Sequence, residues 1–231
     1  MKYPHQVVIF DLGGVVLSSP HEGLTEYETE LNLPKYTLGK LLNYNDNDGD
    51  FAKLERNEIS FNHYCTVTEE KFSKLHNQSG QQAFSAKRMV EKLEKYSSTI
   101  NLAVVEVIAN LRSLGIVTCA LTNNWYNIDS EEVLSAAESY KLTTSQHKEM
   151  TTELRNHFDH FFESREMLLR KPQSLIYKKV LDALNVDAKN CIYLDDIGQN
   201  LKPMRELGAK TILVKNVEEA LKELKEYYEI K

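Results

Sequence analysis

The chain has 231 residues, of which 42% are hydrophobic and 27% are charged, and its formal net charge is −6. This length accommodates one α/β domain with a modest inserted subdomain, and the composition is that of an ordinary globular protein. The negative charge argues against non-specific attraction to nucleic acid or to an anionic membrane, so we expect neither as a partner.

Three cysteines at long spacings argue against a disulfide scaffold or a zinc ribbon. Two of them, Cys119 and Cys191, lie in apolar runs and are expected in the core. No apolar run reaches the length of a membrane span, and residues 1–6 resemble neither a signal peptide nor a transit peptide. The sequence therefore favours a reducing, cytoplasmic setting.

The first predicted element is a strand, Val7–Phe10, whose four consecutive apolar residues are typical of a parallel strand buried on both faces. The strand stops at a carboxylate, Asp11, and two glycines follow at Gly13 and Gly14. In open α/β sheets, ligands bind beyond the carboxyl ends of the strands, and glycines let the backbone turn close to a ligand. Asp11 is therefore a candidate for chemistry.

Residues 18–98 carry no parallel-strand signature and are expected to form an all-helical insertion. Its helices are predicted over residues 27–33, 36–42, 60–75 and 84–96, on the spacing of their apolar residues. The acidic loop at 43–50 resembles a calcium-binding loop, but Phe51 and Asn57 stand where such a loop needs glycine and glutamate. We therefore interpret it as a solvated loop.

From residue 99 the alternation of helix and strand returns. A helix over 102–114 ends at Gly115, and a buried strand over 116–121 leads into Thr122 and Asn123. The polar stretch 130–153 is expected to be an excursion near the site. His157 and His160 could share a metal, but no third ligand stands close by, so we favour a surface or packed pair.

The last part of the chain contains three further strands and three helices. A short strand begins at 161–162, and Arg170-Lys171-Pro172 opens a helix with the proline in its first turn. A strand over 191–194 stops at two carboxylates, Asp195 and Asp196. The remaining elements are a helix at 200–207, a strand at 211–214 and a helix at 217–228.

Several polar residues thus lie at strand ends, and one lies at a helix start. All of them are expected on the same side of the sheet. In chain order they are Asp11, Thr122, Asn123, Lys171, Asp195 and Asp196. Three converging carboxylates would repel one another unless a hard cation such as Mg²⁺ lies between them. A lysine and a hydroxyl alongside supply what a phosphoryl group needs. The sequence therefore predicts a Mg²⁺ site that handles a phosphate group.

This order of motifs resembles the haloacid dehalogenase superfamily of aspartate-nucleophile phosphohydrolases, over nearly the whole chain. The stretches LTNNW, RKPQSLIY and LDDIGQNLKPMRELGAKTILV look similar to the phosphatase domain of soluble epoxide hydrolase and the related domain of acyl-CoA dehydrogenase family member 10. The resemblance implies an α/β fold: a Rossmann-like parallel sheet core at 1–17 and 99–231, with an inserted helical cap at 18–98.

The resemblance also implies Mg²⁺ as cofactor and a small phosphorylated metabolite as substrate. By this resemblance Asp11 would be the nucleophile and a metal ligand, the Gly13 backbone carbonyl a second metal ligand, and Asp196 would complete the metal shell. Thr122 and Asn123 would bind the phosphate, and Lys171 would neutralise charge. Asp195 would orient Lys171 or a metal-bound water.

The chain departs from the family pattern at Gly13. Phosphatases of this family usually carry there a second aspartate, which protonates the leaving oxygen and then activates water, and such help is typically worth roughly 10²–10⁴-fold. We therefore expect slow turnover unless one of two conditions holds. The substrate could have a weakly basic leaving group, as in acyl phosphates, phosphoanhydrides and anomeric sugar phosphates, or bring its own acid. Alternatively, a cap residue such as His21 or Glu22 could replace the aspartate.

Two other readings stay open. A catalytically silent member of the fold would bind a phosphate ligand or a protein partner, and Gly13 favours it. A dehalogenase-type hydrolase would attack carbon and also lacks the second aspartate. It needs no Mg²⁺, however, so the pair Asp195-Asp196 speaks against it.

Overall fold

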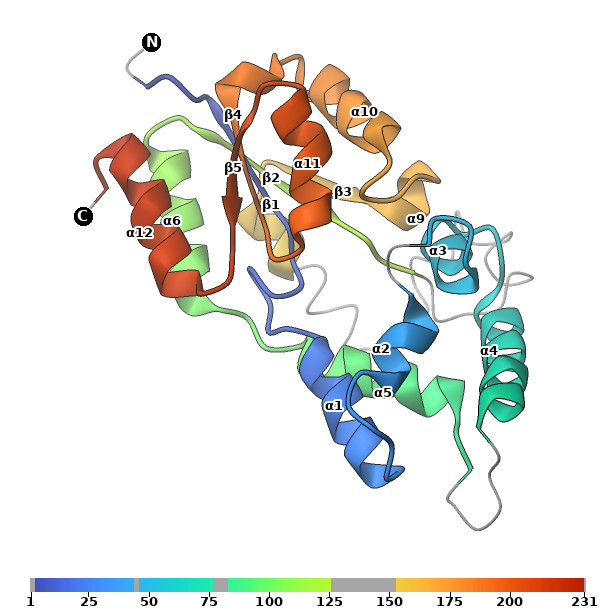
Figure 1. Ribbon diagram of the computed structural model, residues 1–231. Coiled ribbons are helices and arrows are strands. Elements are labelled where there is room, and N and C mark those ends of the chain that lie inside the picture. The colour runs from blue at the N-terminus through green and yellow to red at the C-terminus, as the bar shows by residue number, and fades with distance from the viewer. Residues whose placement is uncertain (1–2, 44–45, 77–82, 126–152, 231) are drawn as a thin grey trace.

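The computed structural model describes residues 3–43, 46–76, 83–125 and 153–230. At the centre of this part is a five-stranded, all-parallel sheet in the order β3-β2-β1-β4-β5 (Figure 1). The strands are β1 (Val7–Phe10), β2 (Val117–Thr122), β3 (His160–Glu163), β4 (Cys191–Asp195) and β5 (Lys210–Leu213). Phe10 is in register with Ala120 and Leu194, so the three central strands end within two residues of the same level.

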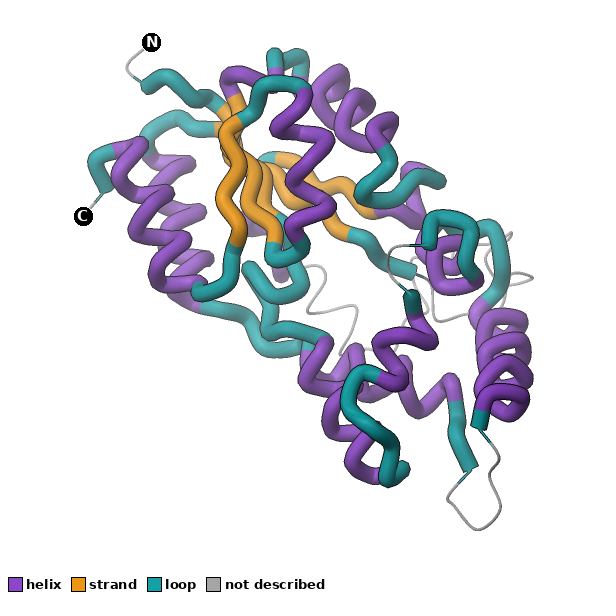
Figure 2. The backbone as a smooth tube through the Cα atoms, in the orientation of Figure 1, coloured by secondary structure: helices purple, strands orange, loops and turns teal. Residues whose placement is uncertain are grey.

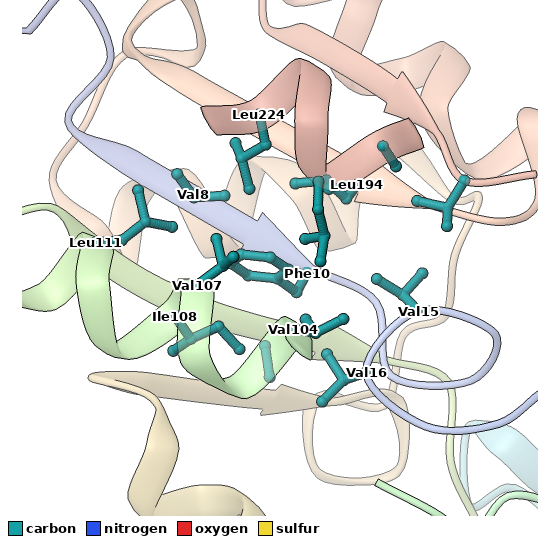
Figure 3. Close-up of a cluster of buried hydrophobic side chains, with 14 of the residues drawn as sticks. Val8, Phe10, Val15, Val16, Val104, Val107, Ile108, Leu111, Leu194 and Leu224 are labelled. Carbon is teal, nitrogen blue, oxygen red and sulfur yellow. The ribbon is translucent and has the colours of Figure 1, made fainter. Parts of the chain in front are cut away.

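One face of the sheet is covered by α6 (Leu102–Ser113) and α12 (Val217–Tyr228). Their apolar side chains pack against Val8, Phe10 and Leu194, all of which are buried (Figure 3). The rings and branched side chains in this cluster come from elements that are far apart in the sequence.

The opposite face is covered by α10 (Ser174–Leu184) and α11 (Gly198–Glu206), which pack against Ile9 and Tyr193. Successive residues of a strand point to opposite faces of the sheet. Because helices cover both faces, the central strand has no polar side, which explains the uninterrupted apolar run seen in the sequence.

Between β1 and α6 in the sequence, the described chain is helical and contains no strand of the sheet, as Figure 2 shows. Its helices are α1 (His21–Glu30), α2 (Thr37–Leu42), α3 (Asp50–Glu55), α4 (Phe61–Leu75) and α5 (Ala86–Tyr96). They share a hydrophobic core of their own, in which Tyr27, Tyr64 and Met89 are buried. The bounds of this cap, residues 18–98, stay a prediction.

Several predicted boundaries were wrong. The helix expected at 27–33 is α1, which starts earlier, at His21. The prediction missed this start because the first residues of the helix are polar and carry no apolar signal. No helix was expected where α3 forms. The polar excursion expected at 130–153 lies outside the described residues except for its last position.

The helix after Lys171 also starts later than predicted. Residues 170–173 form a turn in which the Gln173 N–H donates to the Arg170 carbonyl at 2.9 Å, and the Arg170 N–H donates to Gln173 Oε1 at 3.0 Å. Pro172 therefore precedes α10 instead of lying in its first turn. Within the residues described, no helix is both long and apolar enough to cross a lipid bilayer.

A buried ion pair joins the helical insertion to the sheet. Arg170 Nε lies 2.5 Å from Glu55 Oε2 at the end of α3, and the two side chains are 2% and 3% exposed. Arg170 also donates to Asn47 Oδ1 at 3.0 Å, and the Ser164 hydroxyl donates to the Glu55 carbonyl at 2.7 Å. Removing one partner of a buried pair leaves an uncompensated charge, so this junction depends on both residues.

Arg170→Met is expected to lower the free energy of unfolding by about 3–5 kcal/mol, because it leaves the Glu55 carboxylate buried without its arginine. Arg88→Met is the control, since its pair with Glu30 is far more exposed, and it is expected to cost less than about 1 kcal/mol. Urea denaturation measures both. Equal decreases in the free energy of unfolding of the two variants would contradict the stabilising role that we assign to the buried pair.

Candidate active site

Three neighbouring strands deliver polar side chains to one edge of the sheet. Asp11 follows β1 directly, and its backbone N–H donates to the Leu194 carbonyl at 2.9 Å, which extends the pairing with β4. Thr122 is the last residue of β2, and Asp195 is the last residue of β4, with Asp196 next to it. The shared register of the strands thus brings these groups together.

Lys171 reaches the same edge from the segment between α9 (Ser164–Met167) and α10. Its Nζ lies 2.8 Å from Asp11 Oδ1 and 2.8 Å from Asp195 Oδ2, and its side chain is 1% exposed. Burial acts to lower the pKa of Lys171, but the two carboxylates outweigh it, so the pKa is raised. The amine therefore stays protonated between them.

Asn123 holds the backbone of Lys171 on both sides. Its side-chain oxygen accepts from the Lys171 N–H at 2.9 Å, and its Nδ2 donates to the Lys171 carbonyl at 3.1 Å. Both ends of the amide are thus engaged within the protein, which positions the lysine segment beside the end of β2.

Asp195 is completely buried and is surrounded by donors. Besides Lys171, it accepts from the Tyr193 hydroxyl, from Asn200 Nδ2 at 3.0 Å and from the Ile197 N–H at 2.8 Å. A carboxylate held by so many donors has one orientation. Asp195 is therefore placed to fix the position of the Lys171 ammonium.

Asp11, Asp195 and Asp196 offer carboxylate oxygens that all lie within 4.8 Å of one another, the one such acidic, histidine or cysteine group found in the described parts of the chain. Burial and the charge of Asp195 raise the pKa of Asp11 well above its usual range, although Lys171 acts against them. The same two causes raise the pKa of Asp196 to about 6. Crowded carboxylate oxygens that resist ionisation fit a hard cation such as Mg²⁺.

The two glycines after Asp11 differ in what they permit. Gly14 has a φ of +72°, and a Cβ there would lie 2.3 Å from Asp196 Oδ2, so only glycine lets Asp196 approach this backbone. At Gly13 a Cβ would meet Pro20 Cδ at 3.4 Å, an ordinary contact. Position 13 therefore has room for a side chain.

A pocket covers these groups where the sheet edge meets the helical insertion. It is lined by the predicted site residues Asp11, Gly13, Thr122, Asn123, Lys171 and Asp196. The insertion contributes further side chains, among them His21 and Phe51. Asp195 does not line the pocket and lies beneath it, behind Lys171.

Sequence reasoning missed the residues that support the site. Tyr193 lies two residues before Asp195 in β4, on the same face of the strand, so the alternation of the strand was a usable signal. Asn200 and the pair Glu55–Arg170 have no such signal, since their partners are distant in the sequence.

The other candidate metal ligands make local contacts. The His160 ring stacks on Phe162, with centroids 6.3 Å apart, and His160 opens β3 at the end of the sheet away from the pocket. The His157 carbonyl accepts from Arg112 at 3.3 Å. In the acidic loop, Asp46 Oδ1 accepts from the Asp48 N–H at 3.0 Å.

Comparison with known sequences gives consistent matches. A family model described as haloacid dehalogenase-like hydrolase matches residues 5–208. Bifunctional epoxide hydrolase 2 of Sus scrofa is 34% identical over 223 residues, which cover 95% of this chain and 38% of the relative. Acyl-CoA dehydrogenase family member 10 of Mus musculus is 28% identical over 221 residues, with coverages of 95% and 19%. The chain thus spans well under half the length of these relatives.

Solved structures share the fold. A protein described as a predicted HAD-like family hydrolase from Porphyromonas gingivalis has a TM-score of 0.63 and 19% identity, covering 96% of this chain and 98% of that one. A HAD family enzyme from Bacteroides thetaiotaomicron, in complex with magnesium and inorganic phosphate, has a TM-score of 0.57 and 20% identity, with coverages of 91% and 94%. The expected α/β, Rossmann-like core is confirmed.

Gly14→Ala is expected to displace the Asp196 carboxylate and to weaken Mg²⁺ binding by about 10–100-fold, because the new Cβ would overlap it. Gly115→Ala is the matched control: its φ is +77°, yet nothing lies within 4 Å of the added Cβ. Both variants carry backbone strain of about 1–2 kcal/mol, but only the first should lose Mg²⁺ in a calorimetric titration. Unchanged Mg²⁺ affinity in Gly14→Ala would refute the cation site.

Proposed function

Because this chain belongs to the haloacid dehalogenase-like hydrolases, we propose that it is a Mg²⁺-dependent phosphohydrolase that acts on a small phosphorylated metabolite through an aspartyl-phosphate intermediate. The observation that carries the proposal is the buried Lys171 ammonium, 2.8 Å from both Asp11 and Asp195, at the floor of a pocket that Thr122 and Asp196 also line. A nucleophile, a fixed positive charge and a hydroxyl are the groups that phosphoryl transfer requires.

In this proposal Asp11 is the nucleophile. Its Oδ1 accepts from the Leu12 N–H at 2.6 Å and lies beside Lys171, so the carboxylate is held still at the pocket floor. Attack on phosphorus forms the bond from the aspartate oxygen to phosphorus while the bond to the leaving oxygen breaks. Water then attacks the phosphorus and releases phosphate and the free carboxylate. Lys171 neutralises charge on Asp11 throughout.

We assign phosphate binding to the Thr122 hydroxyl and to the Asn123 backbone N–H. The side-chain amide of Asn123 hydrogen-bonds to the Lys171 backbone, so we assign the phosphate contact of this residue to its backbone.

Asp11, Asp196 and the Gly13 carbonyl would hold the Mg²⁺, with Asp195 behind them orienting Lys171. When bound, the cation supplies positive charge that stabilises the phosphoryl oxygens in the transition state. The structure from Bacteroides thetaiotaomicron, in complex with magnesium and inorganic phosphate, supports this assignment by its fold.

The same proposal places the protein in the cytoplasm, with no nucleic acid or membrane as partner. All three cysteines are free thiols, which suits a reducing compartment, and the net charge is −6.

Gly13 favours a second candidate function: a catalytically silent member of the family that binds a phosphate ligand or a protein partner. Such a silent member would have the same pocket but would lack the family's usual acid and base at position 13. A dehalogenase-type attack on carbon is the weaker alternative, because it needs no cation and gives the acidic cluster no task.

Asp11→Asn is expected to lower Mg²⁺-dependent hydrolysis of p-nitrophenyl phosphate on the order of 10³-fold or more, because it removes the nucleophile. Asp182→Asn, a change of the same kind on the exposed face of α10, should keep the wild-type rate. Hydrolysis that survives in Asp11→Asn, or that is unaffected when EDTA removes the Mg²⁺, would contradict the proposal.

Gly13→Asp separates the enzyme from the silent relative. A Cβ at this position would make only an ordinary contact with Pro20, and an aspartate there would restore the family's usual acid and base. We expect the rate on an alkyl phosphate to rise at least about tenfold, within the range typical of such groups. A variant that binds Mg²⁺ normally and still shows no hydrolysis would favour the silent candidate.

A further inference from the structure

We propose that His21 performs the proton transfers that Gly13 cannot, as the general acid and base of this site; the inference rests on the phosphohydrolase proposed above. The sequence left His21 and Glu22 equally open for this task. The position of α1 over the pocket distinguishes them.

The start of α1 lies against the place where the missing side chain would project. A Cβ at position 13 would be 3.4 Å from Pro20 Cδ and 3.8 Å from Pro20 Cγ. Pro20 is the N-cap of α1, and His21 is the first residue of that helix. His21 lines the same pocket as Asp11, Thr122 and Lys171, whereas Glu22 does not line it.

The titratable side chains of the pocket are of different chemical kinds. Within the described residues, those that line it are Asp11, His21, Glu55, Arg170, Lys171 and Asp196. Lys171 pairs with Asp11, Glu55 pairs with Arg170, and Asp196 belongs to the acidic cluster. His21 is the histidine of this set, and imidazole is the side chain whose ordinary pKa suits proton transfer near neutral pH.

Backbone contacts hold His21 in place. The Gly23 N–H donates to the Pro20 carbonyl at 3.0 Å, and the Ser18 N–H donates to the Thr99 carbonyl at 2.9 Å. Gly23 packs so closely on α5 that a Cβ there would lie 2.4 Å from the Lys92 carbonyl oxygen. The first turn of α1 is therefore fixed relative to the pocket, as a proton-transfer group requires.

The chemistry balances over the two half-reactions. In the first, the imidazolium gives its proton to the leaving oxygen as the phosphorus–oxygen bond breaks and its electron pair moves onto that oxygen. In the second, the neutral imidazole takes a proton from the water that attacks the phosphoaspartate, which restores the imidazolium and the Asp11 carboxylate. Burial lowers the pKa of His21, which makes the imidazolium a stronger acid.

The test compares two substrates of similar size with different leaving groups, in the presence of Mg²⁺. Nitrophenolate is a weak base and leaves without a proton, whereas the benzyl alcohol oxygen requires one. His21→Asn is expected to lower kcat/KM on benzyl phosphate on the order of 100-fold and kcat/KM on p-nitrophenyl phosphate by less than about threefold, because kcat/KM reports formation of the phosphoaspartate and not its hydrolysis, which is common to both substrates. Glu22→Gln, next in the chain and exposed, should change neither rate.

A rescue experiment separates chemistry from support of the fold. Gly13→Asp added to His21→Asn should restore hydrolysis of benzyl phosphate, because it returns an acid to the same space next to Pro20. A purely structural role of His21 would not be rescued by a carboxylate. The rise in melting temperature on adding Mg²⁺ and inorganic phosphate should be the same in His21→Asn and in the wild type.

Equal losses on the two substrates, or no loss on either, would overturn the assignment of His21. So would a wild-type enzyme that hydrolyses p-nitrophenyl phosphate but not benzyl phosphate, since no acid would then operate in the pocket. A wild-type protein inactive on p-nitrophenyl phosphate would instead remove the proposed phosphohydrolase itself, and the two failures are thereby distinguished.

Discussion

A single buried ammonium group, that of Lys171, sets the electrostatics of the sheet edge. It lies within 2.8 Å of Asp11 and of Asp195, and Asp196 completes a cluster of three carboxylates. One positive charge does not balance three negative ones, and the raised pKa values of Asp11 and Asp196 are the consequence. A divalent cation would remove the imbalance, which is why the geometry suits Mg²⁺ and a phosphate ester better than it suits a cation-free reaction.

Two consecutive residues connect this cluster to the helical insertion. Lys171 forms an ion pair with the carboxylate of Asp11 at the sheet edge, while Arg170 is buried against Glu55 at the end of α3. Both charged side chains line the pocket, so two ion pairs form part of its wall, one at the sheet edge and one with Glu55 of the insertion. The insertion therefore takes part in the site, supplying α1 and α3 as its walls.

The two glycines after Asp11 are subject to different packing constraints. Gly14 is required by space, since Asp196 occupies the volume of any Cβ at that position. Gly13 faces no such obstacle, so space does not require glycine at that position. Pro20, the N-cap of α1, lies next to this position and His21 lines the same pocket, so we expect the residue that replaces the missing carboxylate at the start of α1.

The sequence alone determined the sheet and the edge at which the site forms. Apolar runs that end at Asp11 and Asp195 predict parallel strands and polar groups at one edge, because strand burial and strand direction are encoded locally. Only the tertiary structure shows the contacts of Asn123 and Arg170, and that His21 lines the pocket while Glu22 does not. Each depends on a partner or a cavity formed by distant segments, and local sequence carries no record of such contacts.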